Sequence, residues 1–448
     1  MNSPAQLPSK TERLERAIRS GTPGGAAVIL ADMSPGDVAY LIASSPPDFR
    51  DILLGLLEHE QEALVVNELP DELRSAALAD RAPEVLAEIV EQLDDDDGAD
   101  ILQELPGDVT ERVLAIMDEQ YRQRLQTVLS FPDDIAGGLM STDTITIRAD
   151  LTLDVVLRYL RRHTELPPNT DNLIVVNRND RFVGLLPIST VLVSDPAVSV
   201  REMMITDQQA IDAEVPAAEV AHLFERNDWI SAPVVDADGK LLGRITIDDV
   251  VDVIMEEADH SLTSLAGLAE EDTFAPVWHS APRRAVWLGI NLVTALLASS
   301  VINLFQDTIE KVVALAVLMP IVASMGGIAG TQSLTILIRA MAMGQITHRN
   351  QLWLVGRESL VGALNGCFWA LVIAATTAIW FGDPTLGFII ACAMLINLVT
   401  AGLAGAGLPI VLRKLEIDPA LAGGVLVTTI TDVMGFLTFL WLAALYYG

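Results

Sequence analysis

The spacing of apolar residues divides the chain into two regions. Before residue 281 apolar residues recur at the short intervals of amphipathic helices and strands, whereas after it they form long runs almost free of charge. A helix needs about 20 apolar residues to cross the hydrocarbon core of a bilayer. Five runs have this length: 285–305, 312–343, 359–381, 386–412 and 420–447. We therefore expect a membrane domain of five α-helical spans over residues 282–448.

Small residues are concentrated in two of these runs, as SMGGIAGTQS (324–333) and AGLAGAGLP (401–409). They allow helix backbones to approach closely, or backbone carbonyls to face a cavity, and the sequence leaves both interpretations open. The run 312–343 is also long enough for its helix to be tilted, or to be interrupted at the glycine-rich stretch.

An internal repeat occupies residues 139–262. LMSTDTITIRADLTLDVVLRYLRRH (139–163) aligns without a gap with MMITDQQAIDAEVPAAEVAHLFERN (203–227). Further on, IVVNRNDRFVGLLPISTVL (174–192) aligns with PVVDADGKLLGRITIDDVV (233–251). Each copy predicts a strand, a helix, a hairpin that turns at NRND or DADG, and a second helix. Two related α+β units are expected.

Short amphipathic helices are expected over residues 26–131, after a flexible N-terminus formed by residues 1–25. NELPDELRSAAL (67–78), EQLDDDDGADIL (91–102) and QELPGDVTERVL (103–114) carry proline or acidic residues where a helix would begin. Such residues suit the first turn of a helix and its dipole. The regular punctuation predicts an α-helical N domain built as a superhelical array.

The formal net charge of the chain is −32, and it is unevenly distributed. From residue 281 onward eight basic residues accompany seven acidic ones, so residues 1–280 carry a net charge of −33. An acidic surface repels nucleic acid and concentrates cations. We therefore expect divalent cations, and no nucleic acid, among the partners. Cys367 and Cys392 both lie in apolar runs, which excludes a disulfide framework and a thiolate zinc site.

The orientation in the membrane follows from the basic residues. The N-terminal stretch MNSPAQLPSKTERLER lacks the apolar core of a signal peptide. Basic residues precede the first run and separate the second from the third and the fourth from the fifth: Arg283, Arg284, Arg349, Arg357, Arg413 and Lys414. By the positive-inside rule the acidic region faces the cytoplasm and the C-terminus lies outside.

Asp432 is the only ionisable residue of the last run apart from two terminal tyrosines. A carboxylate at membrane depth costs about 2.5–3.5 kcal/mol, so it should face the interior of a bundle or a water-filled path. Thr428 lies one helical turn earlier and can point the same way. Pairing with Arg339 or Arg357 is the alternative role for Asp432, although long side chains near helix ends can reach water instead.

Two acidic stretches contain more carboxylates than helix capping requires. One comprises Asp94, Asp95, Asp96, Asp97 and Asp100. The other, DDVVDVIMEEADH, comprises Asp248, Asp249, Asp252, Glu256, Glu257 and Asp259. Solvated carboxylates are one explanation. A cation site is the other, and oxygen ligands without histidine or cysteine suit Mg²⁺ or Ca²⁺.

The internal repeat resembles a tandem pair of CBS domains, which commonly sense nucleotides or ions. Gly243, Thr246 and Asp249 in GRITIDD come close to the G-x-x-T-x-x-D pattern with which such domains hold an adenosine ribose and phosphates. The first copy reads GLLPIST, with Pro187 and Thr190 in place of the hydroxyl and the carboxylate. The resemblance implies one nucleotide site at most, for example for ATP. An ordinary turn capped by Asp249 explains the motif equally well.

The order of domains resembles that of the MgtE family of magnesium channels. The most specific pieces are the junction FPDDIAGGLM, MPIVASMGGIAGTQS (319–333) and DPALAGGVLVTTITDVMGF (418–436). The resemblance implies a first CBS domain over residues 132–200, a second over 201–247, and a connecting or plug helix with its linker over 248–281.

The resemblance also implies a function. It describes a homodimer in the bacterial plasma membrane that admits Mg²⁺ through a pore on its two-fold axis. Asp432 would attract the hydrated ion, and the further pore residues would be Thr428, Thr429, Gly327, Gly330 and Gln332. Mg²⁺ bound between the acidic cytoplasmic domains would close the pore when magnesium is plentiful.

Other functions remain open at this point. The family pattern has asparagine where GGIAGTQ has Ile328, so a transporter of Co²⁺, Ni²⁺, Ca²⁺ or Na⁺ on the same architecture is one alternative. A membrane-anchored nucleotide sensor is another. An enzyme is not expected, because no nucleophile, general base and orienting partner occur at a recognisable spacing.

Overall fold

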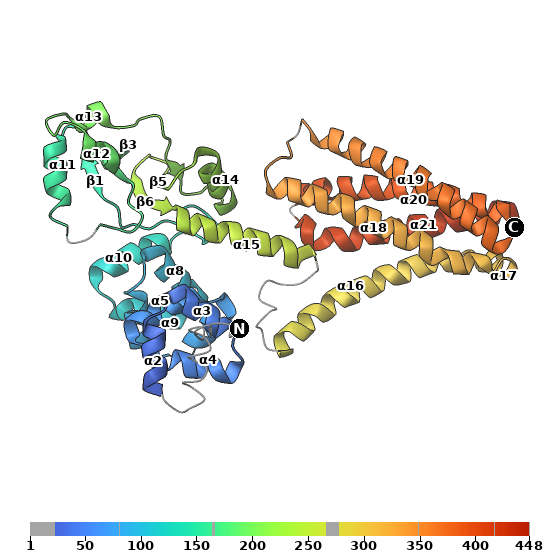
Figure 1. The fold of residues 1–448 in the computed structure, drawn as a ribbon, viewed down its shortest axis with the longest axis horizontal. Helices are drawn as coiled ribbons and strands as arrows, with labels where there is room; N and C mark the ends of the chain where they lie inside the picture. Colours follow the sequence, from blue (N-terminus) through green and yellow to red (C-terminus); the bar gives the residue numbers. More distant parts are fainter. Residues whose placement is uncertain are drawn as a thin grey trace, which may run out of the picture. The chain divides into compact units, whose positions relative to one another are not determined.

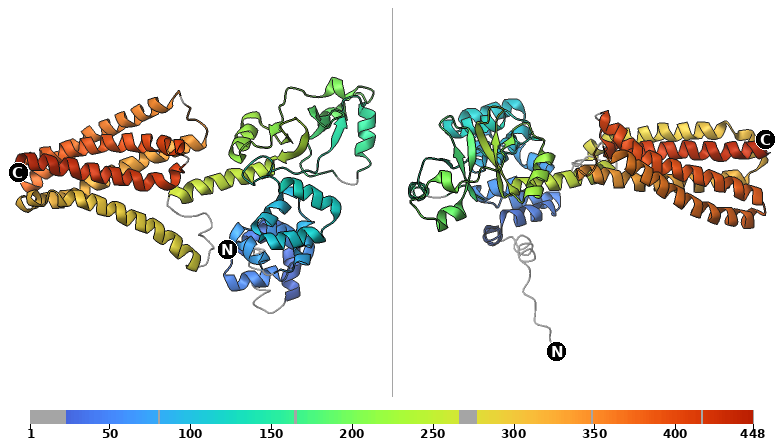
Figure 2. Two further views of the ribbon diagram at one scale, coloured as in Figure 1. Left: turned by 180° about the vertical axis from the view of Figure 1, so that it is seen from behind. Right: turned by 90° about the horizontal axis from the view of Figure 1, so that it is seen from above.

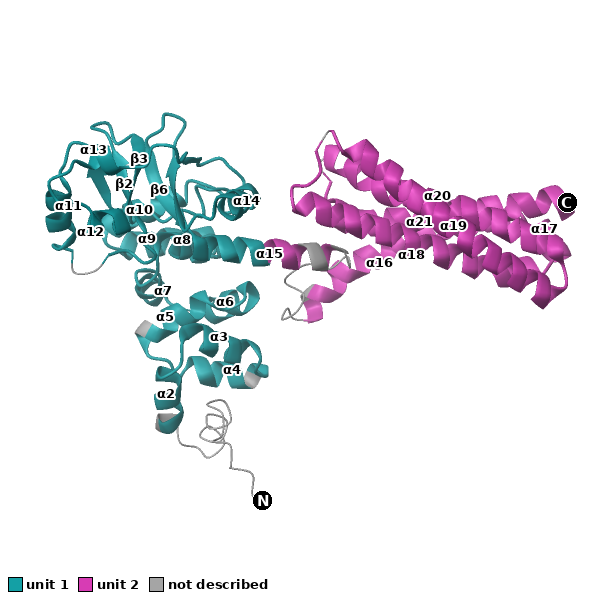
Figure 3. Cartoon of the chain, turned by 45° about the horizontal axis from the view of Figure 1, so that its top comes forward, with its two compact units in different colours: residues 1–255 teal, residues 256–448 magenta. Residues whose placement is uncertain are grey.

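The structure is a computed structural model that describes residues 23–79, 81–163, 166–265, 277–347, 349–415 and 417–447. The chain forms two compact units, Met1–Met255 and Glu256–Gly448 (Figure 3). Residues 1–22 of the expected flexible N-terminus lie outside the described residues, whereas residues 23–25 already belong to a helix.

The first unit begins with an array of short helices (Figure 1). They are α2 (Pro23–Ala31), α3 (Pro35–Ala43), α4 (Pro47–Leu54), α5 (His59–Asn67), α6 (Asp71–Leu78), α7 (Pro83–Val90), α8 (Asp95–Glu104), α9 (Gly107–Ile116) and α10 (Glu119–Val128). Helices α3, α4 and α7 open with proline, whose fixed backbone angle and missing N–H suit the first turn. Leu86, Ile101 and Leu125 lie in the shared apolar core. The predicted helical N domain is confirmed.

The internal repeat folds as two similar α+β units. The first contains β1 (Thr146–Arg148), α11 (Leu153–Leu160), β2 (Asn172–Val176), β3 (Phe182–Pro187) and α12 (Ile188–Val193). After α13 (Val200–Met203), the second contains β4 (Ile211–Asp212), α14 (Ala217–Asn227), β5 (Ser231–Val235), β6 (Leu241–Thr246) and α15 (Ile247–Leu265). In each sheet the first strand is parallel to the second, and the second is antiparallel to the third. The predicted order of elements is confirmed.

The two copies exchange the segments that precede them. Ser141, ahead of the first copy, forms two backbone hydrogen bonds of 2.9 Å with Arg244 in β6 of the second. Ile205, ahead of the second copy, forms the matching pair of 2.9 and 2.7 Å with Leu185 in β3 of the first. The repeat is therefore a pseudo-symmetric pair in which each copy completes the edge of the other.

This exchange moves the domain boundaries expected from the sequence. Ala136 and Met140 pack in the core of the second copy, although they precede the first. Met203 and Met204 pack against the core of the first copy. Helix α15 begins directly after β6, so the last helix of the second CBS domain and the start of the expected connecting helix are one element.

The second unit contains the long apolar helices. They are α16 (Val277–Asn303), α18 (Ala314–Ala342), α19 (Gln351–Phe381), α20 (Pro384–Lys414) and α21 (Pro419–Tyr447), with the short α17 (Gln306–Lys311) between the first two. Within the described residues, five helices are long and apolar enough to cross a membrane. The predicted number of spans is confirmed.

Helices α18, α19, α20 and α21 run side by side as a bundle (Figure 2). Of the five long helices, α20 is the most buried and α16 is almost entirely exposed. Helix α18 is continuous through the glycine-rich stretch, so the interruption considered as one possibility is not observed. Close approach of glycine to backbone, such as Gly402 to the Glu358 carbonyl, agrees with the packing interpretation of the small residues.

Candidate functional site

A groove of about 930 Å³ lies on the second unit, and every residue that lines it comes from α18 or α21. From α21 it is lined by Thr428 and Asp432, which lie one helical turn apart as expected. From α18 it is lined by Ala323, Ser324, Gly327, Ile328, Thr331, Gln332, Thr335 and Ile336. We call this feature the groove.

Asp432 is partly buried in the groove and has no hydrogen-bond or ion-pair partner among the described residues. The arginine alternative fails at Arg357, whose Nη1 lies 2.8 Å from Oε1 of Glu358. Arg339 is exposed and is not paired with Asp432 in the described part of the chain. The carboxylate is therefore available to a ligand in the groove.

Hydroxyl groups line the groove together with this carboxylate. The hydroxyls of Thr428 and Thr331 each donate to a carbonyl of their own helix, at Gly424 and Gly327, with donor–acceptor distances of 2.9 Å. A hydroxyl that donates in this way keeps lone pairs for accepting hydrogen bonds. The groove thus combines one negative charge with several neutral acceptors.

Two of the expected pore residues do not line the groove. A Cβ at Gly330 would lie 2.4 Å from Cγ1 of Val427, so this glycine serves the contact between α18 and α21. The Thr429 hydroxyl donates to the Val425 carbonyl at 2.7 Å on another side of α21. Gly327 has open space at its Cβ, which suits a groove-lining position.

The expected pore residues did not include Ser324, Thr331 and Thr335, which also line the groove. These residues recur at intervals of seven and four, which places them on one face of a helix together with Gly327 and Ile328. This periodicity was the signal that could have found them.

The second candidate site lies in the first unit, where the N-termini of α8 and α15 bring carboxylates within electrostatic range. Burial raises the pKa of Asp96 well above its usual value, and the negative charge of Asp249 raises it further. Burial also raises the pKa of Asp97 to about 6, with contributions from Asp94 and Asp252 and against a hydrogen bond from Asn67. We call Asp94, Asp96, Asp97, Asp248, Asp249 and Asp252 the acidic cluster.

Individual members of the acidic cluster differ in their environment. Asp96 is 7 % exposed, and its Oδ1 is buried with no hydrogen-bond partner among the described residues. Asp248 accepts a hydrogen bond of 2.6 Å from the Asn169 amide. Burial raises the pKa of Asp249 to about 7, opposed by hydrogen bonds from Thr246. Asp94 and Asp252 are exposed.

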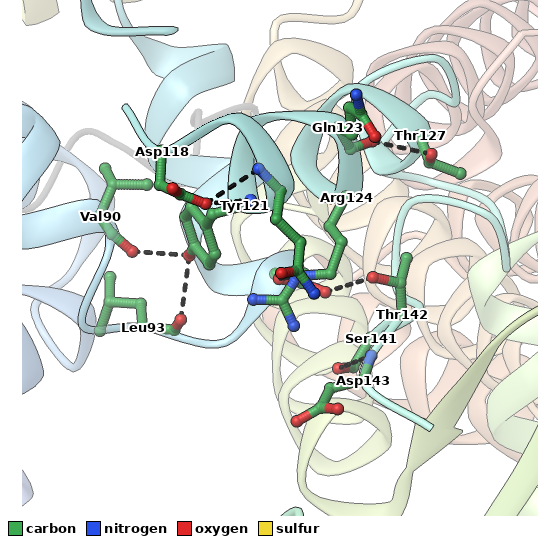
Figure 4. A network of polar contacts seen from close by, with 12 residues as sticks. Val90, Leu93, Asp118, Tyr121, Gln123, Arg124, Thr127, Ser141, Thr142 and Asp143 are labelled. Carbon is green, nitrogen blue, oxygen red and sulfur yellow. Dashed lines mark hydrogen bonds and ion pairs between the residues drawn. The ribbon is translucent and has the colours of Figure 1, made fainter. Parts of the chain in front are cut away.

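Asp95 lies within the same acidic run but has partners outside the cluster, and Figure 4 shows two of them, Arg124 and Thr142. It is 2 % exposed, accepts a hydrogen bond from the Thr142 hydroxyl, and lies 3.5 Å from Nε of Arg124. The Tyr121 hydroxyl donates to the carbonyls of Val90 and Leu93, at 2.7 and 3.0 Å, just ahead of the run. Asp95 is thus already paired, which argues against its expected role as a metal ligand.

The remaining expected ligands are not gathered with the cluster. Asp100 is partly exposed on α8, and its charge acts on Arg74. Glu256, Glu257 and Asp259 are exposed on the part of α15 that belongs to the second unit. Across the described residues no three His, Cys, Asp or Glu side chains are close enough together to hold a metal ion. Carboxylates of the two acidic stretches are therefore close enough to repel one another, but they do not form a coordination sphere in the described residues.

The nucleotide motif of the second CBS copy has structural explanations. A Cβ at Gly243 would lie 2.6 Å from the Ser141 carbonyl, and Gly184 has the same relation to Ile205 in the first copy. Asp249 accepts a hydrogen bond of 3.0 Å from the Thr246 N–H and so caps α15. The structure therefore shows Asp249 in the role of a helix cap, which was one of the two explanations for the motif.

Five membrane-length helices and a groove with an unpartnered carboxylate, together with a CBS pair, define an integral membrane protein of the transporter or channel class. Three family descriptions match: "Divalent cation transporter" over residues 319–442, "MgtE intracellular N domain" over 33–134, and "CBS domain" over 134–194 and 200–256. The chain belongs to the MgtE family.

Relatives extend over nearly the whole chain. A protein of Thermus thermophilus named magnesium transporter MgtE is 31% identical over 96% of this chain and 97% of its own length. One of the same name from Bacillus subtilis is 29% identical over 93% of this chain and 92% of its own. A crystal structure described as the cytosolic domain of the Mg²⁺ channel MgtE in complex with ATP matches 54% of this chain and 99% of that chain, with 30% identity and a TM-score of 0.51.

Proposed function

We propose that this chain carries Mg²⁺ into the cell across the bacterial plasma membrane, and that the ion passes along the groove. The observation that carries the proposal is the unpartnered Asp432, which lies among neutral oxygen atoms between two membrane-length helices. The names of the relatives from Thermus thermophilus and Bacillus subtilis support Mg²⁺ as the transported ion.

Hydration chemistry explains why one carboxylate with neutral acceptors suits this ion. Mg²⁺ loses its water reluctantly and keeps an octahedral shell at about 2.0–2.1 Å. Asp432 supplies attraction, and the hydroxyls of Thr428, Thr331 and Thr335 supply acceptors for the hydrogen atoms of bound water. The ion is then recognised through its shell, without being stripped. Ile328 contributes an apolar surface where the family pattern has an amide.

We propose that two copies of the chain form the complete pathway. The groove is an open surface of one protomer, and a second copy across a two-fold axis would bring a second Asp432 to face the first. Two carboxylates at one constriction double the attraction for a divalent ion. The basic residues between the spans support cytoplasmic domains and an external C-terminus.

The acidic cluster is the proposed sensor of cytoplasmic Mg²⁺. Asp96, Asp97 and Asp249 are crowded, so their negative charges oppose close packing of α8 against α15. A divalent ion between the two helix ends relieves the repulsion, and the unpartnered Oδ1 of Asp96 is the oxygen best placed to accept it. Ion binding would then favour the compact, closed state by its differential affinity.

ATP is a second candidate ligand, for the CBS pair. The support is the crystal structure of a related cytosolic domain in complex with ATP. Thr246 and Asp249 bond to one another here, so ATP that binds at this motif would have to replace or share these hydrogen bonds. Binding of a fluorescent ATP analogue to the purified full chain, displaced by unlabelled ATP, would test this.

The transport proposal is tested by ion flux into liposomes that contain the purified full chain. Mg²⁺ uptake is expected to exceed uptake of Co²⁺, Ni²⁺, Ca²⁺ and Na⁺, and millimolar Mg²⁺ on the cytoplasmic side is expected to slow it. Faster flux of any of the other ions would replace Mg²⁺ as the proposed substrate. Absence of flux of every ion would reject a transport function for the groove.

A further inference from the structure

Asn397 is a fully buried amide in α20, the helix that packs against both groove-lining helices. Its Nδ2 donates a hydrogen bond of 2.9 Å to the Val322 carbonyl on α18. The side chain does not line the groove, so it has no direct contact with an ion there.

Both groove-lining helices make room for this amide with a glycine. A Cβ at Gly326 of α18 would lie 2.2 Å from Nδ2 of Asn397, and a Cβ at Gly435 of α21 would lie 2.8 Å from it. Any other residue at either glycine would collide with the amide. The three helices therefore meet around Asn397.

This meeting point lies directly behind the groove. Gly326 precedes Gly327, which lines the groove, and Gly435 follows Asp432 by three residues, slightly less than one helical turn. A change in the size or hydrogen bonding of residue 397 would thus alter the spacing of α18 and α21 at the level of Asp432.

Stability alone does not account for an amide at this position. Oδ1 of Asn397 is buried with no hydrogen-bond partner among the described residues, and an unpaired buried acceptor destabilises the folded chain. An apolar side chain of similar branching would avoid that cost. The amide is retained at the expense of stability, which is typical of a residue that serves function.

We infer that Asn397 is a positioning residue of the cation pathway, which sets the spacing of α18 and α21 and thereby the discrimination between Mg²⁺ and Ca²⁺. This inference rests on the proposed transport of Mg²⁺. Discrimination depends on spacing because Mg²⁺ carries a compact octahedral shell, whereas Ca²⁺ takes six to eight ligands at longer distances and exchanges them readily.

The test compares Mg²⁺ and Ca²⁺ uptake by Asn397→Leu with uptake by the unaltered full chain in liposomes. The ratio of the two rates is expected to fall at least about threefold, while the melting temperature in detergent stays the same or rises. Thr377→Val is the matched control, because it removes a different buried polar group without a described partner, the Thr377 hydroxyl of α19, and α19 does not line the groove. Its ratio is expected to be unchanged. Asn397→Ala covers the case in which leucine is too large to be accommodated.

Each other outcome has a defined meaning. No Mg²⁺ uptake by the unaltered chain would reject the transport proposal itself. Normal uptake by that chain with an unchanged ratio in folded Asn397 variants would overturn the positioning role. A ratio that falls equally in Thr377→Val, or a failure of both Asn397 variants to fold, would assign the amide to general packing.

Discussion

The groove and the acidic cluster both contain carboxylates that are at least partly buried, but the surroundings of these carboxylates are opposite. In the groove a single carboxylate, Asp432, lies with hydroxyls along the lining and pairs with no charged residue in the described part of the chain. In the acidic cluster several carboxylates lie within range of one another, and burial and mutual repulsion raise the pKa of Asp96, Asp97 and Asp249.

This difference separates a site that attracts a cation from a site whose packing changes when a cation binds. A lone charge with neutral acceptors attracts a hydrated cation, yet it holds that cation weakly enough to release it. Crowded carboxylates repel one another when they are all charged. The packing of the helices that carry them therefore depends on the protons or cations that neutralise them. In the proposed function the same type of side chain serves passage in one unit and sensing in the other, so substitutions in the two places should have different effects.

The largest effect is expected for Asp432→Asn. A unit charge attracts another at 4 Å with about 4 kcal/mol at an effective dielectric constant of about 20, so loss of Asp432 should reduce Mg²⁺ uptake at least about 100-fold. Growth of a bacterial strain that lacks its own magnesium uptake, at low external Mg²⁺, measures this. Asp307→Asn, which neutralises an exposed acid of α17, is the control and should support growth. Equal growth of both variants would remove Asp432 from the pathway.

The next effect concerns Asp95, the member of the acidic run that is already paired. Asp95→Ala removes the interactions with Arg124 and Thr142 and should destabilise the first unit by about 2 kcal/mol. Urea-dependent protease cleavage of the full chain measures the change. Asp108→Ala, which removes an exposed pair with Arg112, should stay within about 0.5 kcal/mol. The Mg²⁺ concentration that gives half protection from protease should be unchanged in Asp95→Ala. A marked increase in this concentration would mean that Asp95 contributes to Mg²⁺ binding after all.

A smaller effect is expected from pH. The folded-state pKa values of Asp97 and Asp249, about 6 and about 7, lie above the ordinary value of 3.8. The folded chain therefore binds protons more tightly than the unfolded chain, so this contribution to stability is complete below about pH 4 and is lost as pH rises through 6 to 7.

Without Mg²⁺, lowering the pH from 8 to 5.5 should therefore raise the melting temperature of the first unit in the full chain by about 2–4 °C. Asp97→Asn should flatten this dependence, and saturating Mg²⁺ should raise the melting temperature more at pH 8 than at pH 5.5. A melting temperature that rises with pH would contradict the assignment of repulsion to the cluster.

The smallest effect compares two neighbouring hydroxyls. Thr428 lines the groove and Thr429 does not, although each donates to a carbonyl of its own helix. Thr428→Val should slow Mg²⁺ uptake about fivefold through the loss of one acceptor worth about 1 kcal/mol, whereas Thr429→Val should leave the rate unchanged. Rates in liposomes decide this, and a larger effect of Thr429→Val would mean that a different face of α21 meets the ion.

The sequence predicted those features that depend on local pattern. The five apolar runs and the repeat specify their helices and strands directly, and Asp432 stands out because it is a single charge in an apolar run. Features that depend on packing could not be predicted from the sequence. Gly330 and Gly327 look alike in the sequence, but one contacts Val427 and the other lines the groove.

The same limit applies to the first unit. The repeat reveals two copies, but it does not reveal that Ser141 pairs with Arg244 of the other copy, because that pairing is long-range. The acidic run Asp94–Asp97 reads as four equivalent carboxylates. The pairing with Arg124 and Thr142 makes Asp95 different from the other three, and this pairing cannot be read from spacing.

The most direct measurement of the central claim is the reactivity of a cysteine placed at Thr428 in a chain in which Cys367 and Cys392 are replaced by alanine. Our account predicts that a charged, water-soluble thiol reagent modifies Thr428→Cys, and that hexaamminecobalt(III), an inert mimic of hydrated Mg²⁺, slows the reaction. This protection should disappear when Asp432 is also replaced by asparagine. A cysteine that does not react, or whose reaction is slowed equally with and without Asp432, would contradict a wet cation pathway at this carboxylate.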